Sequence, residues 1–222
     1  MTFFFHQLKN HFKNDHLSDW FDKMNSTDYQ KDKPTEFYNH LANEKKKYID
    51  KMYDIFMFKY PDYVIRDINQ TQIETYIQNN SKKIFLKPEL YSKKYDIYVQ
   101  PDIIIHKDIF TEIFSQVDQT ELPNYLVIDI LYLILHFNSD KTDILNQGNV
   151  YYYKCKIALS ITCLKYLTDR KYGFFLAKDY KYKDQLLEKK QTIGKFLIDP
   201  DYLDDIRDGI QWLKRLHKKY YF

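Results

Sequence analysis

Two apolar, β-branched runs dominate the hydrophobic pattern of the chain. The first, at 95–110, reads YDIYVQPDIIIHKDIF, and the second, at 124–137, reads NYLVIDILYLILHF. Each run has an aspartate near its centre, Asp102 in the first and Asp129 in the second. A carboxylate inside a buried strand is costly unless it is paired or holds a metal ion. We therefore predict two neighbouring strands whose aspartates share one site.

The spacing of apolar residues predicts helices around these strands. A long helix is expected from Pro34–Thr35 to Tyr60–Pro61, and two short helices within 3–24, broken near Asn14–Asp15. Further helices are expected at 71–78, 107–116, 150–168 and 200–220, and short strands at 63–65, 83–86 and 171–178. This order is typical of an α/β or α+β layered domain. A polar linker at 25–33 divides the chain into a helical N-terminal extension, 1–33, and one domain, 34–222.

Composition excludes several classes of protein. Hydrophobic residues make up 44% and charged residues 29% of the chain, as expected of a globular protein and not of a disordered one. No apolar run approaches the ~20 residues of a membrane span, so no membrane partner is expected. The net charge of +3 is typical of an ordinary solvated surface. Cys155 and Cys163, two turns apart on one predicted helix, cannot bridge each other, and the start lacks a secretory pattern, so we expect an intracellular protein.

The two aspartates indicate a specific chemistry, metal-dependent phosphodiester hydrolysis. In such sites two carboxylates on neighbouring strands hold Mg²⁺ or Mn²⁺ through oxygen ligands. A lysine two residues after the second carboxylate faces the same site, because alternate residues of a strand point the same way, and it stabilises charge near the phosphate. The corresponding position here is Leu131.

The ordered motifs of residues 34–218 resemble the PD-(D/E)XK nuclease superfamily, and most closely the version carried by large DNA viruses. FYNHLANEKKKYIDKMYDIF resembles the family's first helix, which a strand follows. QPDIIIHKDIF resembles the strand that carries the family's PD, and YLVIDILYLILHF resembles the strand of its (D/E)xK. NQGNVYYYKCKIALSITCL resembles the loop and YKxQ helix, and KYGFFLAKDYKY, TIGKFLID and GIQWLKRL resemble the segments that follow. The resemblance implies a restriction-endonuclease-like core, a small mixed central sheet flanked by helices, in the domain 34–222. It also implies Mg²⁺ or Mn²⁺ at Asp102 and Asp129.

The chain departs from the family at four positions. Val99 stands where the family has a small residue, Ile49 where it has an acid on the first helix, and Leu131 where it has lysine. Lys156 stands where the helix motif has glutamine. Glu44 and Asp50 lie near Ile49 in sequence but on other faces of the predicted helix.

These departures leave three hypotheses. The sequence favours an inactivated nuclease, retained in a viral factory, the host cytoplasm or a virion for binding DNA or RNA, in which Asp102, Asp129 and Lys154 are a vestigial or rearranged site. Its nucleic-acid contacts would come from Lys154, Lys156 and Tyr153, since lysines hold phosphates and tyrosines stack on bases. The second hypothesis is an active nuclease in which Lys154 or Lys156 supplies the missing ammonium, with Glu44 or Asp50 as the acid. The third is a structural protein that contacts other viral proteins. A cationic nitrogen within about 4–6 Å of both carboxylates would favour activity.

Overall fold

The computed structural model describes residues 2–24, 33–117, 121–139, 143–164, 167, 171–183, 185–187 and 193–218. Its helices are the 3-10 turns η1 (Phe5–Leu8) and η2 (His11–Lys13) and the α-helices α1 (His16–Met24), α2 (Glu36–Lys59), α3 (Gln70–Gln78), α4 (Lys107–Ile113), α5 (Val150–Cys163) and α6 (Asp201–Lys218). Its strands are β1 (Phe3–Phe4), β2 (Val64–Ile65), β3 (Ile84–Leu86), β4 (Leu90–Ser92), β5 (Ile97–Val99), β6 (Ile103–His106), β7 (Tyr125–His136), β8 (Tyr172–Tyr182), β9 (Gln185–Leu186) and β10 (Ile193–Leu197). The mixed α/β class predicted from the sequence is confirmed.

A mixed sheet forms the centre of the molecule. Its strands follow the order β10-β8-β7-β6-β3-β2, and β9 pairs with β8 at the side. Strand β6 pairs antiparallel with both β3 and β7, whereas β7 and β8 are parallel. Parallel neighbours require a long crossover connection, and α5 lies on that connection.

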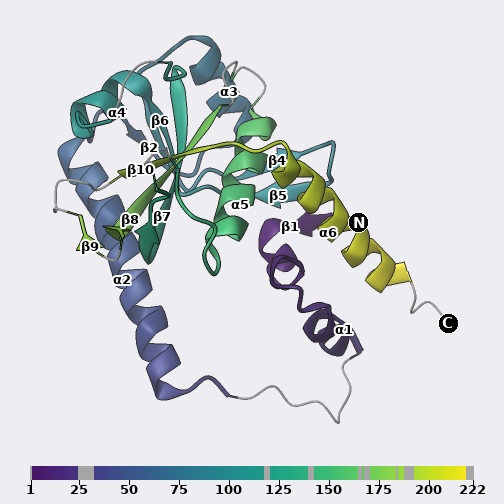
Figure 1. Ribbon diagram of the computed structural model, residues 1–222. Helices are drawn as coiled ribbons and strands as arrows, with labels where there is room; N and C mark the ends of the chain where they lie inside the picture. Colours follow the sequence, from purple (N-terminus) through teal and green to yellow (C-terminus); the bar gives the residue numbers. More distant parts are fainter. Residues whose placement is uncertain are drawn as a thin grey trace.

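Helices cover both faces of this sheet (Figure 1). Helix α2 lies along one face together with α4, and α5 lies against the other face with α6 outside it. Because side chains alternate along β7, Leu126, Ile128 and Ile130 pack on the side of α2, while Val127 and Leu131 pack on the side of α5. Asp129 is therefore on the α5 side, at a position that is 0% exposed.

Helix α2 begins and ends as its sequence predicts. Thr35 caps its start, since the Thr35 hydroxyl accepts a hydrogen bond of 3.2 Å from the amide of Tyr38. The helix ends at Lys59, two residues before Pro61, which cannot continue it. Its first turns extend past the sheet, where Phe37 is 74% exposed (Figure 1).

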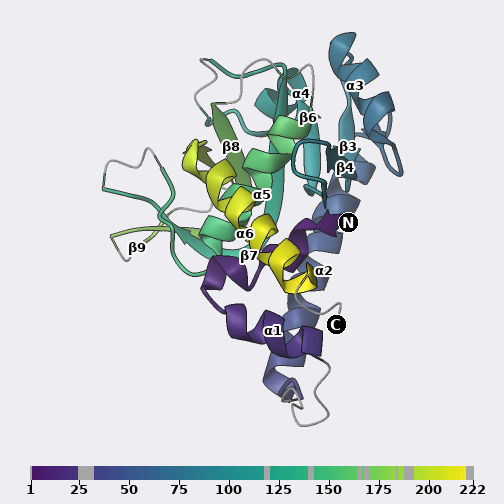
Figure 2. The same cartoon turned by 90° about the vertical axis from the view of Figure 1, so that its right-hand side faces the viewer.

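The N-terminal residues are part of the core. Strand β1 pairs in parallel with β5, which also pairs with β4, so the three strands form a second sheet in the order β1-β5-β4. Phe3, Phe5 and Leu8 are buried in the core that α5 and α6 share. Figure 2 shows the N-terminal segment lying beside α6, where the indole N–H of Trp212 donates to the carboxylate of Asp19 at 3.0 Å.

The expectation of short helices within 3–24, broken near Asn14–Asp15, is confirmed in outline. Asn14 has a left-handed φ of 55° and separates η2 from α1. The expected extension also contains a strand, β1, that the sequence did not predict. The expected linker at 25–33 falls almost entirely outside the described residues, and the division of the chain at residue 33 stays a prediction.

Several expected boundaries were wrong. Helix α4 ends at Ile113 and not at 116, and β8 continues to Tyr182 and not only to 178. The run at 95–110 was expected to place Asp102 inside one strand, but β5 ends at Val99 and β6 begins at Ile103, in different sheets. Pro101 explains the break, since it lacks a backbone N–H and restricts the residue before it. Helix α5 ends at Cys163, because Leu164 is extended, whereas the predicted helix continued to 168; residues 165, 166 and 168 lie outside the described part of the chain.

Candidate functional site

Asp102 and Asp129 meet at the boundary between β6 and β7. The Asp129 carboxylate accepts a hydrogen bond of 3.0 Å from the backbone amide of Asp102. The Asp102 carboxylate in turn accepts one of 2.8 Å from the amide of Ile130, the residue after Asp129. Each carboxylate thus accepts a hydrogen bond from the backbone of the facing segment where β6 begins, Asp129 from Asp102 itself and Asp102 from Ile130. The two aspartates therefore adjoin each other, and their use as a functional site stays a prediction.

Lys156 supplies a cation to this pair. Its ammonium nitrogen lies 2.9 Å from Oδ1 of Asp129. The Asp129 side chain is 0% exposed and that of Lys156 is 16% exposed, so the ion pair is largely shielded from solvent. Helix α5 packs on the face of the sheet that carries Asp129, which places Lys156 directly opposite this carboxylate.

Tyr53 of α2 makes the fourth contact of the site. Its hydroxyl donates a hydrogen bond of 2.7 Å to Oδ1 of Asp102, and the side chain is 1% exposed. The ammonium of Lys87 lies 4.5 Å from the centre of the Tyr53 ring, on its face. The position expected for the family's acid, Ile49, precedes Tyr53 by one helical turn and packs half-buried among apolar residues.

Burial and charge set the ionisation of these groups. Burial raises the pKa of Asp129 to about 6, against the lowering effect of Lys156, and the neighbouring Asp102 adds to the rise. Burial disfavours the ammonium of Lys156, but Asp129 and Asp102 together outweigh that effect and raise its pKa. Burial, followed by Asp102, raises the pKa of the Tyr53 hydroxyl. At neutral pH Asp129 and Lys156 are therefore an ion pair, and Tyr53 is a neutral donor.

Lys154 does not join the site. Successive helical residues are about 100° apart, so Lys154 and Lys156 point to opposite sides of α5, about 200° from each other. The Lys154 ammonium lies 2.5 Å from the carbonyl oxygen of Ile144 and 3.3 Å from the carboxylate of Asp143, and the side chain is 1% exposed. The prediction of Lys154 as a catalytic or phosphate-binding residue was wrong, because this lysine is buried in contacts to the loop before α5.

The other predicted residues lie at the edge of the site or away from it. Leu131 is 1% exposed and, with Tyr153, lines a separate cavity of about 360 Å³ between α2, β7 and α5. Lys45 of α2 donates a hydrogen bond of 3.2 Å to the Tyr153 hydroxyl. Glu44 forms a surface ion pair of 2.8 Å with Lys47. Asp50 is close enough to Tyr53 to add slightly to the rise in its pKa.

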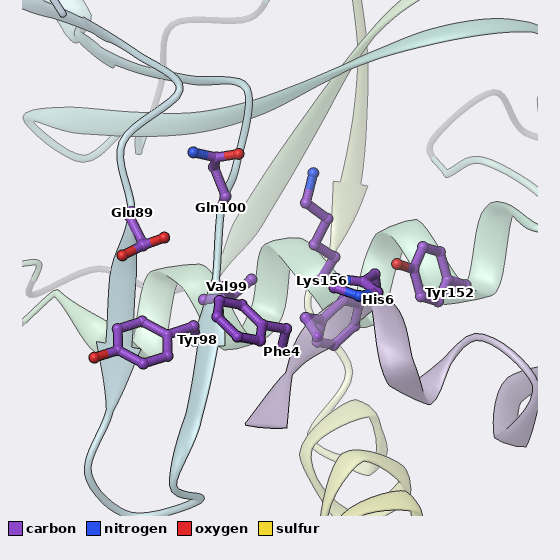
Figure 3. A pocket seen from close by; sticks show the side chains of 9 residues that line it. Phe4, His6, Glu89, Tyr98, Val99, Gln100, Tyr152 and Lys156 are labelled. Carbon is purple, nitrogen blue, oxygen red and sulfur yellow. The ribbon is translucent and has the colours of Figure 1, made fainter. Parts of the chain in front are cut away.

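A cavity of about 360 Å³ opens beside Lys156 (Figure 3). Its lining comes from the N-terminal segment, the β4–β5 hairpin and α5: Phe4, Phe5, His6, Glu89, Tyr98, Val99, Gln100, Tyr152 and Lys156. Figure 3 shows Gln100 and Lys156 extending to the same side of the Phe4 and Tyr98 rings. Val99, where the family has a small residue, is one wall of this cavity. The cavity gives a ligand access to Lys156.

The donor set at the two aspartates fits a small divalent cation. Oδ2 of Asp129 is buried, and no group in the described part of the chain donates a hydrogen bond to it. A buried carboxylate oxygen without a donor is well suited to a cation. Each Asp102 oxygen accepts one hydrogen bond and keeps a second lone pair. The described residues contain no cluster of three or more His, Cys, Asp or Glu side chains suited to a metal. Mg²⁺ is nevertheless commonly held by one or two carboxylates and several waters, and Mn²⁺ takes the same oxygen ligands.

Tyr53, Gln100 and Glu89 are among the residues of this region that the sequence did not nominate. Tyr53 lies within an apolar helical stripe, and the pattern alone does not separate a core tyrosine from a site tyrosine. The spacing did offer one indication of Tyr53 as a site residue. Tyr53 follows Ile49, the position expected for an acid, by four residues and so lies on the same helical face.

The sequence matches no family model, and no curated protein is significantly similar to it. Within the described ranges, no helix combines the length and apolar character needed to cross a membrane.

Proposed function

We propose that the protein is a Mg²⁺- or Mn²⁺-dependent nuclease whose lysine has moved from the strand to the facing helix. The observation that carries the proposal is the triad of Asp102, Asp129 and Lys156. One ammonium lies 2.9 Å from Asp129, and its pKa is raised by both carboxylates. Leu131 occupies the strand position where a lysine was expected, and Lys156 occupies the helix position where a glutamine was expected. Lys156 on the helix thus supplies the positive charge that Leu131 does not provide on the strand.

The order of elements supports the same proposal. The helix α2, the strand β3, the strand that follows Asp102, the strand with Asp129, the helix with Lys156 and the strand β8 occur in the order that the resemblance implies. The helices cover both faces of a mixed sheet, as in the restriction-endonuclease-like core that the resemblance implies. The link to large DNA viruses stays a prediction.

Each residue of the site has a definite role in this proposal. Asp102 and Asp129 would hold the cation, which when bound supplies Lewis-acid activation of the phosphate and of water. Lys156 keeps its proton at neutral pH, so its ammonium can stabilise the charge that develops on the phosphate in a partly dry site. Tyr53 holds Asp102 in place through its hydroxyl, while the amide of Ile130 holds the other oxygen.

The direct test is cleavage of nucleic acid by purified protein. Single- and double-stranded DNA and RNA are incubated with Mn²⁺, with Mg²⁺ or with EDTA, for the wild type, Asp129→Asn and Lys156→Gln. We expect metal-dependent cleavage that both substitutions reduce by at least about a hundredfold, the scale of losing a preorganised charge. Lys214→Gln, an exposed lysine of α6, is the matched control and should cleave as the wild type does. Cleavage that survives Asp129→Asn, or no cleavage with any metal, would refute the proposal.

The second candidate is a nucleic-acid-binding protein without catalysis. It is favoured by the hydrogen bond that the Tyr53 hydroxyl donates to Asp102 and by the complete burial of Asp129, since both reduce the access of a cation to the carboxylates. An oligonucleotide mobility shift without cleavage in any metal would support it. A role in viral assembly remains the third hypothesis, and the exposed Phe37 and Phe58 of α2 are the side chains that would favour it.

A further inference from the structure

The small sheet places one aromatic side chain from each of its strands in a single row. In the register of this sheet Phe4 of β1 is opposite Tyr98 of β5, and Tyr98 is opposite Tyr91 of β4. The ring centres of Phe4 and Tyr98 are 5.4 Å apart with an angle of 23° between the planes. Those of Tyr98 and Tyr91 are 4.9 Å apart with an angle of 40°. We call Phe4, Tyr98 and Tyr91 the aromatic row.

The aromatic row is on the outer face of the sheet. The residues that alternate with it, Phe3, Ile97, Val99 and Leu90, are buried in the core. Phe4 itself is 47% exposed, and the two tyrosines are half-buried. The imidazole of His6 extends the row beyond Phe4, with ring centres 5.9 Å apart and 25° between the planes. Cross-strand aromatic pairs do stabilise a sheet, but such pairs do not require an exposed phenylalanine at the edge.

The aromatic row leads to the proposed active site. Phe4 and Tyr98 line the same cavity of about 360 Å³ as Gln100 and Lys156 (Figure 3). At the other end of the row Tyr91 lines a hollow together with Lys93 and Lys94, two exposed lysines of the β4–β5 turn. The Tyr91 hydroxyl there donates a hydrogen bond of 2.7 Å to the Asp96 carboxylate. The row therefore has an ammonium group near each end. One carboxylate, Glu89, also lines the cavity.

We propose that the aromatic row binds the unpaired bases of single-stranded nucleic acid and directs the strand toward Lys156. Aromatic side chains stack on bases of any sequence, and lysines beside them contact the phosphates. Bases in a duplex are stacked on each other and do not present their faces, so a row of this kind selects single strands. The inference rests on the proposed function, because it takes nucleic acid as the ligand of the site, and it adds the class of substrate.

Equilibrium binding without metal tests this inference separately from catalysis. Fluorescein-labelled single strands of about ten nucleotides, in DNA and RNA forms, are titrated with the protein in EDTA and followed by anisotropy, beside a duplex of the same length. We expect the single strands to bind at least about tenfold more tightly than the duplex. Phe4→Leu and Tyr98→Leu should each weaken the single strands by about fivefold to about a hundredfold, the scale of one lost stacking contact. The DNA and RNA arms identify which strand is preferred.

Two controls separate stacking from loss of structure. Phe4→Tyr keeps a ring at the position and should retain at least about half of the wild-type affinity. Phe37→Leu, at an exposed phenylalanine of α2, should leave affinity unchanged. Circular dichroism of each variant should match the wild type.

The outcomes distinguish this inference from the proposed function. Metal-dependent cleavage with equal binding of duplex and single strand would overturn the inference and leave the nuclease proposal standing. Selective single-strand binding that depends on Phe4 and Tyr98, without cleavage in any metal, would support the inference and refute the nuclease proposal. Wild-type affinity in both leucine variants would overturn the inference, whatever the cleavage assay shows.

Discussion

The Lys156 ammonium lies 2.9 Å from the Asp129 carboxylate, although the two residues belong to α5 and β7 and are 27 positions apart. A lysine was expected two residues after Asp129, but Leu131 occupies that strand position. The ion pair with Lys156 supplies the positive charge that such a lysine would have brought. The cationic nitrogen that the sequence left undetermined thus comes from the facing helix. The same contact makes stability and the proposed activity depend on one lysine.

Removing Lys156 should destabilise the fold through Asp129. Lys156→Met leaves a fully buried carboxylate without its cation, and breaking a buried pair typically costs about 3–5 kcal/mol of the free energy of unfolding. Adding Asp129→Asn removes the uncompensated charge, so the double variant should be more stable than Lys156→Met alone. Urea denaturation of the two single variants and the double variant measures this coupling. Lys47→Met, which breaks the exposed pair with Glu44, should cause no measurable change. Additive effects of the two site substitutions would contradict the assignment.

Moving the lysine back to the strand should partly restore activity. Lys156→Gln alone should abolish cleavage, and adding Leu131→Lys should recover at least about a tenth of it, since alternate strand residues face the same site. Leu131 already borders a cavity of about 360 Å³, which leaves space for the longer side chain. Initial cleavage rates in Mn²⁺ compare the variants. A double variant as inactive as Lys156→Gln, with normal circular dichroism, would mean that position 131 does not reach the reacting phosphate.

Activity and metal binding should decline on the acid side of neutrality. The carboxylate form of Asp129 is needed to bind the cation, and burial raises the pKa of this group to about 6. Because a raised pKa means that protonation begins at higher pH, the rate should rise with pH through about 6 and then level off. Lys156→Met removes the charge that opposes this rise, so Mn²⁺ binding by that variant should need a higher pH. Isothermal titration of Mn²⁺ from pH 5 to 8 gives the midpoint, and affinity independent of pH across this range would contradict the role of Asp129.

The Tyr53 hydroxyl should contribute measurably to stability. Tyr53→Phe removes the 2.7 Å hydrogen bond to Asp102 and leaves the ring in place. A hydrogen bond to a charged group contributes about 1.5–3 kcal/mol, so the free energy of unfolding should fall by that amount. Tyr38→Phe, 58% exposed on the same helix, should change it by less than about 0.5 kcal/mol. Equal stability of the two variants in urea would show that the hydroxyl of Tyr53 is not bonded to Asp102.

Acid should loosen the N-terminal segment. The His11 and His16 rings are joined by a contact of 2.9 Å between Nδ1 and Nε2, and His16 lies 4.6 Å from the ring of Trp212. Burial, helped by His16, lowers the pKa of His11, although Asp205 and Asp208 oppose the change. A histidine whose pKa is lowered in the folded state stabilises the fold above about pH 6.5 and loses that effect as pH falls.

Tryptophan fluorescence between pH 7.5 and 5 measures this release. The transition should be absent in His11→Phe and unchanged in His40→Gln, an exposed histidine of α2. A wild-type transition that persists in His11→Phe would assign it to another group.

Local patterns were sufficient for most of the elements. The period of apolar residues located α2, α3, α6 and the strand of Asp129, because helices and strands repeat over a few residues and do not depend on distant partners. The same patterns missed β1, β4 and β9, which are only two or three residues long, and the five-residue edge strand β10. They also treated 95–106 as one strand, since both halves are equally apolar and only Pro101 marks the break.

The sequence by itself determined that Asp102 and Asp129 belong to neighbouring apolar runs and that Leu131 stands where a lysine was expected, since both follow from residue identity and strand alternation. That Asp102 precedes β6 and lies in no strand came from the structure. Only the tertiary structure decided which cation and which donor complete the site. Lys154 and Lys156 are both lysines of α5 and the sequence does not distinguish them. The packing of α5 turns Lys156 toward Asp129 and Lys154 toward Ile144. Tyr53 reaches Asp102 because α2 lies across the sheet at that level. The aromatic row exists only because β1 pairs with a strand more than 90 residues away. Such contacts depend on how separate elements pack, which no local pattern in the chain encodes.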